Sequence, residues 1–227
     1  MAQAENSILE SPVIYDSVAS ALARAEQSET PYRHWILRDV FPQDLLAALQ
    51  AISFTLQELD GVSGKREYHN DSRHYFDQNT MKVFPAAKAV AEAFQAPPMV
   101  RALRDFFDAD LDDTFLRLEF AQDTTGFWLQ PHTDLGVKRI TMLIYLSDGD
   151  GHEDLGTDIY ASESEWAGRS PFAPGVAMAF MPGANTYHGF EERPINGVRK
   201  SLILNYVTKD WRDREQLAFP HQTVSAD

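Results

Sequence analysis

The sequence predicts an α+β fold in which helices pack outside an antiparallel β-sandwich or barrel. Apolar residues recur at helical spacing in the first half of the chain, and short apolar or alternating runs separated by turn residues follow from residue 115 onward. Helices followed by a series of strands are typical of an antiparallel structure with helices on its outside. Because the 227 residues show no break in composition, we expect one domain over residues 1–227.

The part expected to be mainly helical covers residues 1–112. A short strand is predicted over residues 35–37, and residues 55–82 carry few aliphatic side chains, which favours a functional polar loop. Within this loop we interpret residues 61–76 as a candidate lid. Four helices are predicted, each beginning at or beside a proline that fits a first helical turn: Ser11-Pro12, Pro42, Pro85 and Pro97-Pro98.

The predicted β core covers residues 113–208, where the hydrophobic pattern changes from helical spacing to short runs. Residues 209–227 form an extension, in which the charged residues around Trp211 indicate a surface helix or an extended segment. Six runs in the core are predicted to be strands: 115–120, 126–129, 140–146, 158–160, 176–181 and 201–207.

Charge and composition exclude several classes of function. The chain has 34 acidic and 20 basic residues and a formal net charge of −14, and such a surface repels the phosphates of nucleic acids. It has no cysteine, which excludes thiolate zinc sites, iron–sulfur clusters and cysteine nucleophiles. No apolar run approaches the length of a membrane span, and the N-terminus lacks the pattern of a signal peptide. We therefore expect a cytoplasmic protein without nucleic-acid or membrane partners.

Three histidines are followed two positions later by an acidic residue, in the pairs His69/Asp71, His132/Asp134 and His152/Asp154. This composition gives about one such pair by chance, so the spacing alone cannot choose among them. The first pair lies in the polar loop and the third in an acidic, glycine-rich turn, which favours exposed loops for both. Only His132 and Asp134 follow a strand-like run and precede another strand. Side chains two apart on an extended segment point to the same face, so this pair can hold one metal ion.

Later residues supply the other groups that such a site needs. His188 follows an apolar strand and a Pro-Gly turn and offers a third ligand. Arg199 and Ser201 are two apart at the start of the last predicted strand, so their side chains point to the same face. A guanidinium binds a carboxylate through two hydrogen bonds, and a hydroxyl can donate one more. The set predicts a metal and an anion-binding group in one site. For Arg199 alone, the alternative is a surface arginine.

With these motifs in this order, the stretch from Leu116 to Val207 resembles the 2-oxoglutarate-dependent iron(II) dioxygenases of the prolyl-4-hydroxylase-like branch. The resemblance implies a double-stranded β-helix, or jelly-roll, with helices packed outside. It assigns the Fe(II) ligands to His132, Asp134 and His188. It assigns the distal carboxylate of 2-oxoglutarate to Arg199, Ser201 and Tyr145. The run 155–160 departs from the family's Gly-Gly-x-Leu pattern, because Leu155 stands where the first glycine would be.

The resemblance also implies a reaction. Two imidazoles and one carboxylate leave positions on iron for 2-oxoglutarate and dioxygen. Oxidative decarboxylation to succinate and CO2 then accompanies oxidation of a substrate C–H bond. Hydroxylation is expected, because related halogenases have a small residue in the position of Asp134. The candidate donors to the ligand carboxylates or the co-substrate, each with strand-surface packing as the alternative, are Gln130, Thr141 and Asn185.

Several alternatives stay open at this level. An amino-acid-like or other small-molecule substrate is expected because no peptide-binding module is evident, and peptidyl proline or another protein side chain is the alternative. A non-catalytic, cupin-like jelly-roll that binds a metal or metabolite would share the histidines and strands, but it would give Arg199 and Ser201 no paired task. A nucleic-acid demethylase is disfavoured by the acidic balance. In the polar loop, Lys65, Arg66 and Arg73 are candidates to bind an acidic substrate group, with a solvated loop as the simpler interpretation.

Overall fold

The structure, a computed structural model, describes residues 10–56, 63–65 and 72–227. Its helices are α2 (Ser11–Ala23), α3 (Gln43–Ala51), α4 (Gln78–Val83), α5 (Pro85–Gln95) and α6 (Pro97–Phe107). Its strands are β1 (Glu26–Ser28), β2 (His34–Leu37), β3 (Arg73–Tyr75), β4 (Phe115–Asp123), β5 (Leu129–His132), β6 (Lys138–Tyr145), β7 (Asp158–Tyr160), β8 (Trp166–Arg169), β9 (Ala177–Phe180), β10 (His188–Phe190) and β11 (Arg199–Val207). None of the described helices is long and apolar enough to span a lipid bilayer.

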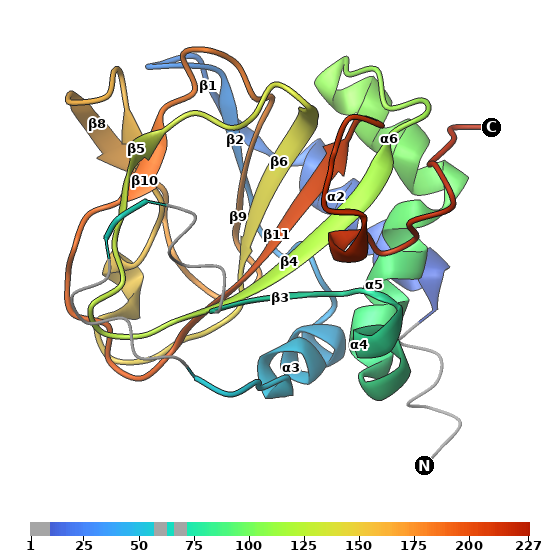
Figure 1. Ribbon diagram of the computed structural model, residues 1–227, viewed down its shortest axis with the longest axis horizontal. Helices are drawn as coiled ribbons and strands as arrows, with labels where there is room; N and C mark the ends of the chain where they lie inside the picture. The colour runs from blue at the N-terminus through green and yellow to red at the C-terminus, as the bar shows by residue number, and fades with distance from the viewer. Residues whose placement is uncertain (1–9, 57–62, 66–71) are drawn as a thin grey trace.

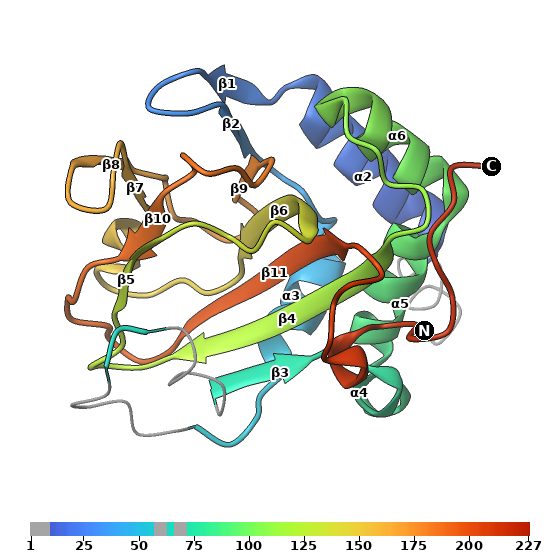
Figure 2. The same cartoon turned by 45° about the horizontal axis from the view of Figure 1, so that its top comes forward.

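Two antiparallel sheets form the core (Figure 1). The larger sheet has seven strands in the order β1-β2-β9-β6-β11-β4-β3, and the smaller has four in the order β5-β10-β7-β8. The helices lie on one side of the larger sheet and the smaller sheet lies on the other (Figure 2). The predicted α+β jelly-roll with helices packed outside is therefore confirmed.

The outer face of the larger sheet is apolar and packs against the helices. Along β11, the alternate residues Leu202, Leu204 and Tyr206 are fully buried in this layer. The Tyr206 hydroxyl donates a hydrogen bond of 2.6 Å to the carbonyl of Phe94 in α5. Burial of these side chains supplies the main force that holds helices and sheet together.

The inner face of the same strands carries buried polar side chains as well as apolar ones. Arg199, Ser201 and Asn205 alternate with the apolar residues of β11 and point toward the smaller sheet. The strand register places Ser201 directly opposite Ala121 of β4 and Tyr145 of β6, so these three side chains share one face. The larger sheet thus separates the hydrophobic core under the helices from an interior between the two sheets. That interior holds buried charges beside a second apolar cluster, which includes Leu143, Phe180 and Phe190.

The smaller sheet brings two histidines together. β10 pairs with β5 so that His188 lies directly opposite His132. Gly189 allows this close approach, because a Cβ at that position would lie 2.6 Å from the carbonyl oxygen of Leu129. On its other side, β5 receives the segment 63–65, since the Gln130 amide donates to the carbonyl of Gly64 at 2.9 Å.

Two boundaries predicted from the sequence are wrong. The strand predicted at 126–129 is a turn followed by β5, because Gly126 has φ of 90° and the Phe127 amide bonds the carbonyl of Thr124. The predicted polar loop 55–82 is regular in its last third, where β3 and α4 occur. The pair His69/Asp71 lies outside the described residues, as does half of the candidate lid 61–76, so the lid stays a prediction.

Candidate metal centre and cavity

Three side chains from two strands converge between the sheets. His132 ends β5, Asp134 follows it by two residues, and His188 begins β10. One ligand atom from each residue lies within 4.8 Å of the other two. Among the described residues, this is the one group of histidines and carboxylates that can hold a metal ion in this way. The imidazole ring centroids are 4.4 Å apart.

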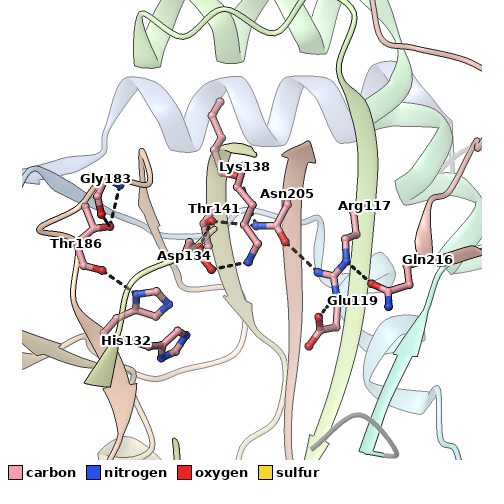
Figure 3. Close-up of polar contacts among 12 residues, drawn as sticks. Arg117, Glu119, His132, Asp134, Lys138, Thr141, Gly183, Thr186, Asn205 and Gln216 are labelled. Carbon is pink, nitrogen blue, oxygen red and sulfur yellow. Dashed lines mark hydrogen bonds and ion pairs between the residues drawn. The ribbon is translucent and has the colours of Figure 1, made fainter. Parts of the chain in front are cut away.

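Backbone carbonyls orient both imidazoles. Nδ1 of His132 donates to the carbonyl of Gln130 at 3.0 Å. Nδ1 of His188 donates to the carbonyl of Thr186, also at 3.0 Å (Figure 3). Each ring therefore has Nε2 left for a metal. Burial, and next the neighbouring His188, lower the pKa of His132 to about 4, and burial also lowers the pKa of His188. Both rings are neutral at neutral pH, which is the form that binds metals.

Asp134 accepts hydrogen bonds on both carboxylate oxygens. Nζ of Lys138 lies 2.5 Å from Oδ1, and the Thr141 hydroxyl donates to Oδ2 at 2.6 Å (Figure 3). Burial alone would raise the pKa of Asp134, but the charge of Lys138, the interaction with His188 and these hydrogen bonds outweigh burial and lower the pKa. Asp134 is therefore an anion at neutral pH. Two neutral imidazoles and one carboxylate form the donor set that suits Fe(II).

A chain of hydrogen bonds runs from Asp134 across the inner face of the larger sheet. Asn205 donates to the Thr141 hydroxyl at 2.9 Å and accepts from Nη1 of Arg117 at 3.0 Å (Figure 3). At the far end of these hydrogen bonds, Arg117 also forms an ion pair with Glu119, which lies on the same strand. The orientation of Asp134 is thus tied to buried charges on β4.

The network of buried polar contacts continues from Glu119 to Arg199, the arginine predicted to bind an anion. Nε of Arg73 lies 3.0 Å from Oε1 of Glu119, and its Nη1 lies 2.5 Å from Oδ1 of Asp123. The second oxygen of Asp123 accepts from Nη1 of Arg199 at 2.7 Å. Asp123 is fully buried and is the shared counter-ion of Arg73 and Arg199, whose side chains are themselves shielded from water.

Arg199 and Ser201 border the same cavity as the three candidate metal ligands. Nε of Arg199 donates to the carbonyl of Leu155 at 2.8 Å. The hydrogen bonds of Arg199 come from Nε and Nη1, so within the described part of the chain Nη2 remains available, as does the Ser201 hydroxyl on the same face of β11. Both groups can therefore donate to an anion in the cavity. The alternative of a surface arginine does not hold, because Arg199 is only 5% exposed.

Comparison with solved structures places the fold. A prolyl-4-hydroxylase from Pseudomonas putida aligns over 88% of this chain and 94% of its own, with a TM-score of 0.55 and 18% sequence identity. A prolyl 4-hydroxylase from Phytophthora capsici aligns over 88% of this chain and 66% of its own, with a TM-score of 0.57 and 13% identity. The chain has the fold of these hydroxylases. No protein-family model matches the sequence, and no curated protein matches it.

The cavity between the sheets has a volume of about 460 Å³ and extends well beyond the candidate metal ligands. Its far wall includes Trp211 and Gln216 from the C-terminal extension, which sequence analysis interpreted as surface structure. The guanidinium of Arg117 lies 4.8 Å from the Trp211 ring centroid and 4.9 Å from that of Tyr75, and its Nε donates to Gln216 at 2.9 Å. The extension is therefore part of the site.

Other predicted residues lie as follows. The Tyr145 hydroxyl donates to the Thr157 hydroxyl at 2.9 Å and contacts the Ser170 hydroxyl at 2.5 Å. Tyr145 does not border the cavity itself, although Thr157 does, so a role toward 2-oxoglutarate stays a prediction. The side chains of Gln130 and Asn185 are exposed, and Gln130 acts through its backbone carbonyl.

The turn 148–154 lies at the surface, as its sequence context indicated, but the side chain of His152 is not exposed with it. Its ring is buried, and its Nε2 donates to the carbonyl of Asn196 at 2.7 Å, whereas Asp154 is exposed. For Arg73, the simpler interpretation of a solvated loop residue is wrong. Arg73 lies on β3, its side chain is 3% exposed, and it borders the cavity.

Proposed function

We propose that this protein is an Fe(II)- and 2-oxoglutarate-dependent dioxygenase that hydroxylates a C–H bond of an amino-acid-like or other small-molecule substrate. The reaction consumes substrate, 2-oxoglutarate and O2 and yields hydroxylated substrate, succinate and CO2, so one oxygen atom enters each organic product. The observation that carries the proposal is that one cavity is bordered both by His132, Asp134 and His188 and by Arg199 and Ser201. The fold of the prolyl-4-hydroxylases supports it.

In this proposal each residue has a defined task. His132, Asp134 and His188 would hold iron. When bound there, iron would supply the redox chemistry by which dioxygen oxidises the substrate C–H bond. The unpaired Nη2 of Arg199 and the hydroxyl of Ser201 take the distal carboxylate of 2-oxoglutarate. Tyr145 supports this end of the cavity from behind through Thr157.

The cavity favours a small substrate. Its volume of about 460 Å³ lies within the range of small-molecule sites and leaves room beside a five-carbon co-substrate. The wall opposite Arg199 contains the aromatic rings of Tyr75 and Trp211, which provide apolar contact area beside charged groups.

The test is anaerobic addition of Fe(II) and 2-oxoglutarate to the metal-free protein. We expect the visible charge-transfer band of a metal-bound keto acid, and we expect Arg199→Ala to lose it at modest keto-acid concentrations while retaining metal affinity. A cupin-like binder would bind the metal and show no band. Candidate compounds are then screened for stimulated succinate release, and a mass gain of one oxygen identifies the substrate. Absence of the band in the native chain with metal bound would overturn the proposal.

A further inference from the structure

Lys138 lies beside the candidate metal ligand Asp134, and the proposed function gives it no task. It begins β6, and its Nζ lies 2.5 Å from Oδ1 of Asp134. The side chain of Lys138 is 13% exposed and that of Asp134 is 6% exposed. Because little water screens the pair, the attraction between ammonium and carboxylate is stronger than in a surface salt bridge.

A metal ion would compete with this ammonium for the carboxylate. The other oxygen of Asp134 accepts from Thr141, whose hydroxyl is held by Asn205 and carries no charge. A divalent ion binds a carboxylate oxygen at about 2 Å, so an ion on Asp134 would stand only a few ångströms from Nζ of Lys138. Two cations at that separation in a poorly hydrated site repel each other strongly.

The structure also offers the ammonium another place. Lys138 borders both the main cavity and a second hollow of about 340 Å³, which Asp110, Arg139 and Met181 also border. A lysine side chain is a flexible four-carbon stem, so its end can turn from Asp134 into either space while the backbone of β6 stays in place.

We propose that Lys138 is the counter-cation of Asp134 before metal binding and that a divalent metal displaces its ammonium from the carboxylate. The proposal rests on the proposed function, because it takes Asp134 as a metal ligand. Lys138 then opposes metal binding, whereas Thr141 supports it. The displaced ammonium gives the cavity a cation beside the metal, with which an anionic group of the substrate can pair.

The first experiment measures the affinity for Co(II), as the probe, by titration calorimetry in the native chain, Lys138→Met and Lys138→Gln. Displacement predicts that both variants bind Co(II) at least about tenfold more tightly, because no ammonium has to leave. A supporting role predicts the opposite sign, a loss of about 10–100-fold. Lys138→Gln retains a neutral hydrogen-bond donor to Asp134, so the comparison can still be made with this variant if Lys138→Met does not fold. Lys88→Met, at an exposed position of α5, is the matched control.

The second experiment follows the ammonium itself. The native chain is treated with an amine-acetylating reagent with and without Co(II), and mass spectrometry measures the modification rate of each lysine. We expect the rate at Lys138 to rise several-fold with Co(II) relative to the rate at the exposed Lys88. An unchanged or lower relative rate means that the ammonium stays on Asp134.

The failures of the two proposals are distinguishable. If the native chain binds Co(II), but the Lys138 variants bind it equally or more weakly, displacement is wrong and the proposed function stands. If neither the native chain nor the variants bind Co(II), the metal site itself is wrong, and displacement falls with it.

Discussion

The two faces of the larger sheet are built from the same strands and both bury apolar side chains, but only the inner face also buries a network of charges. On β11, Leu202 and Leu204 pack outward against helices, whereas Arg199 and Asn205 point inward into a network of buried charges. Apolar burial stabilises a fold by itself, but burial of a charge is costly unless another charge or hydrogen bond compensates it. The outer face is therefore explained by stability, and the buried charges of the inner face need a functional reason.

The largest expected effects separate these faces. His188→Ala removes a candidate metal ligand and should weaken Co(II) binding by more than about 100-fold, while the chain still folds. This loss exceeds the effect expected from removing a residue that only hydrogen-bonds a ligand. Leu204→Ala should instead lower the free energy of unfolding by about 2–5 kcal/mol and leave the Co(II) affinity of the folded protein unchanged. Calorimetry and urea denaturation of both variants check this. Loss of metal binding in Leu204→Ala would show that the faces are not independent.

Asp123 tests how much stability the inner charges require. Asp123→Asn keeps the shape but leaves Arg73 and Arg199 without their shared counter-charge. Since breaking a buried ion pair leaves an uncompensated charge, we expect a loss of roughly 3–5 kcal/mol in the free energy of unfolding. Asp105→Asn, on the exposed face of α6, is the control. A loss as small as that of the control would show that water reaches the two arginines.

Part of this contrast could be predicted from the sequence. Arg199 and Ser201 are two apart at the start of a strand that continues with Leu202 and Leu204, and that period of two correctly placed them on one face of the strand. A similar alternation in the run 115–120, where Arg117 and Glu119 interrupt apolar residues, is a signal in the sequence that the inner face carries charge. Arg73 gave no such signal, because its place depends on the pairing of β3 with β4, a contact between segments far apart in the chain.

The C-terminal extension was missed for a similar reason. Its local sequence is charged, as a solvated surface segment would be. Its position depends on distant partners, since Leu217 forms a bridge with Arg117 and the amide of Val224 bonds the carbonyl of Thr114. Composition cannot predict which face of a sheet such a segment covers.

Thr141 tests the hydrogen-bonded chain with a smaller change. Thr141→Val removes the donor to Oδ2 of Asp134 at nearly constant volume, so the carboxylate is less firmly oriented. We expect Co(II) affinity to fall by about 10–100-fold, the reverse of the effect expected at Lys138. Thr133→Val is the matched control, because Thr133 also borders the cavity, whereas the donors to the two oxygens of Asp134 are Lys138 and Thr141. Equal effects of the two variants would contradict a specific role for Thr141.

The smallest effect is expected at the edge of the inner face, where Trp211 lies over the guanidinium of Arg117. Trp211→Ala removes this contact and should cost about 0.5–2 kcal/mol of unfolding free energy. Trp211→Phe retains a ring and should recover most of it. Co(II) affinity should stay near the native value in both, because Arg117 keeps its bonds to Asn205 and Glu119. If Trp211→Ala weakened metal binding as much as Thr141→Val, the extension would be holding the metal centre in place as well as forming the cavity wall.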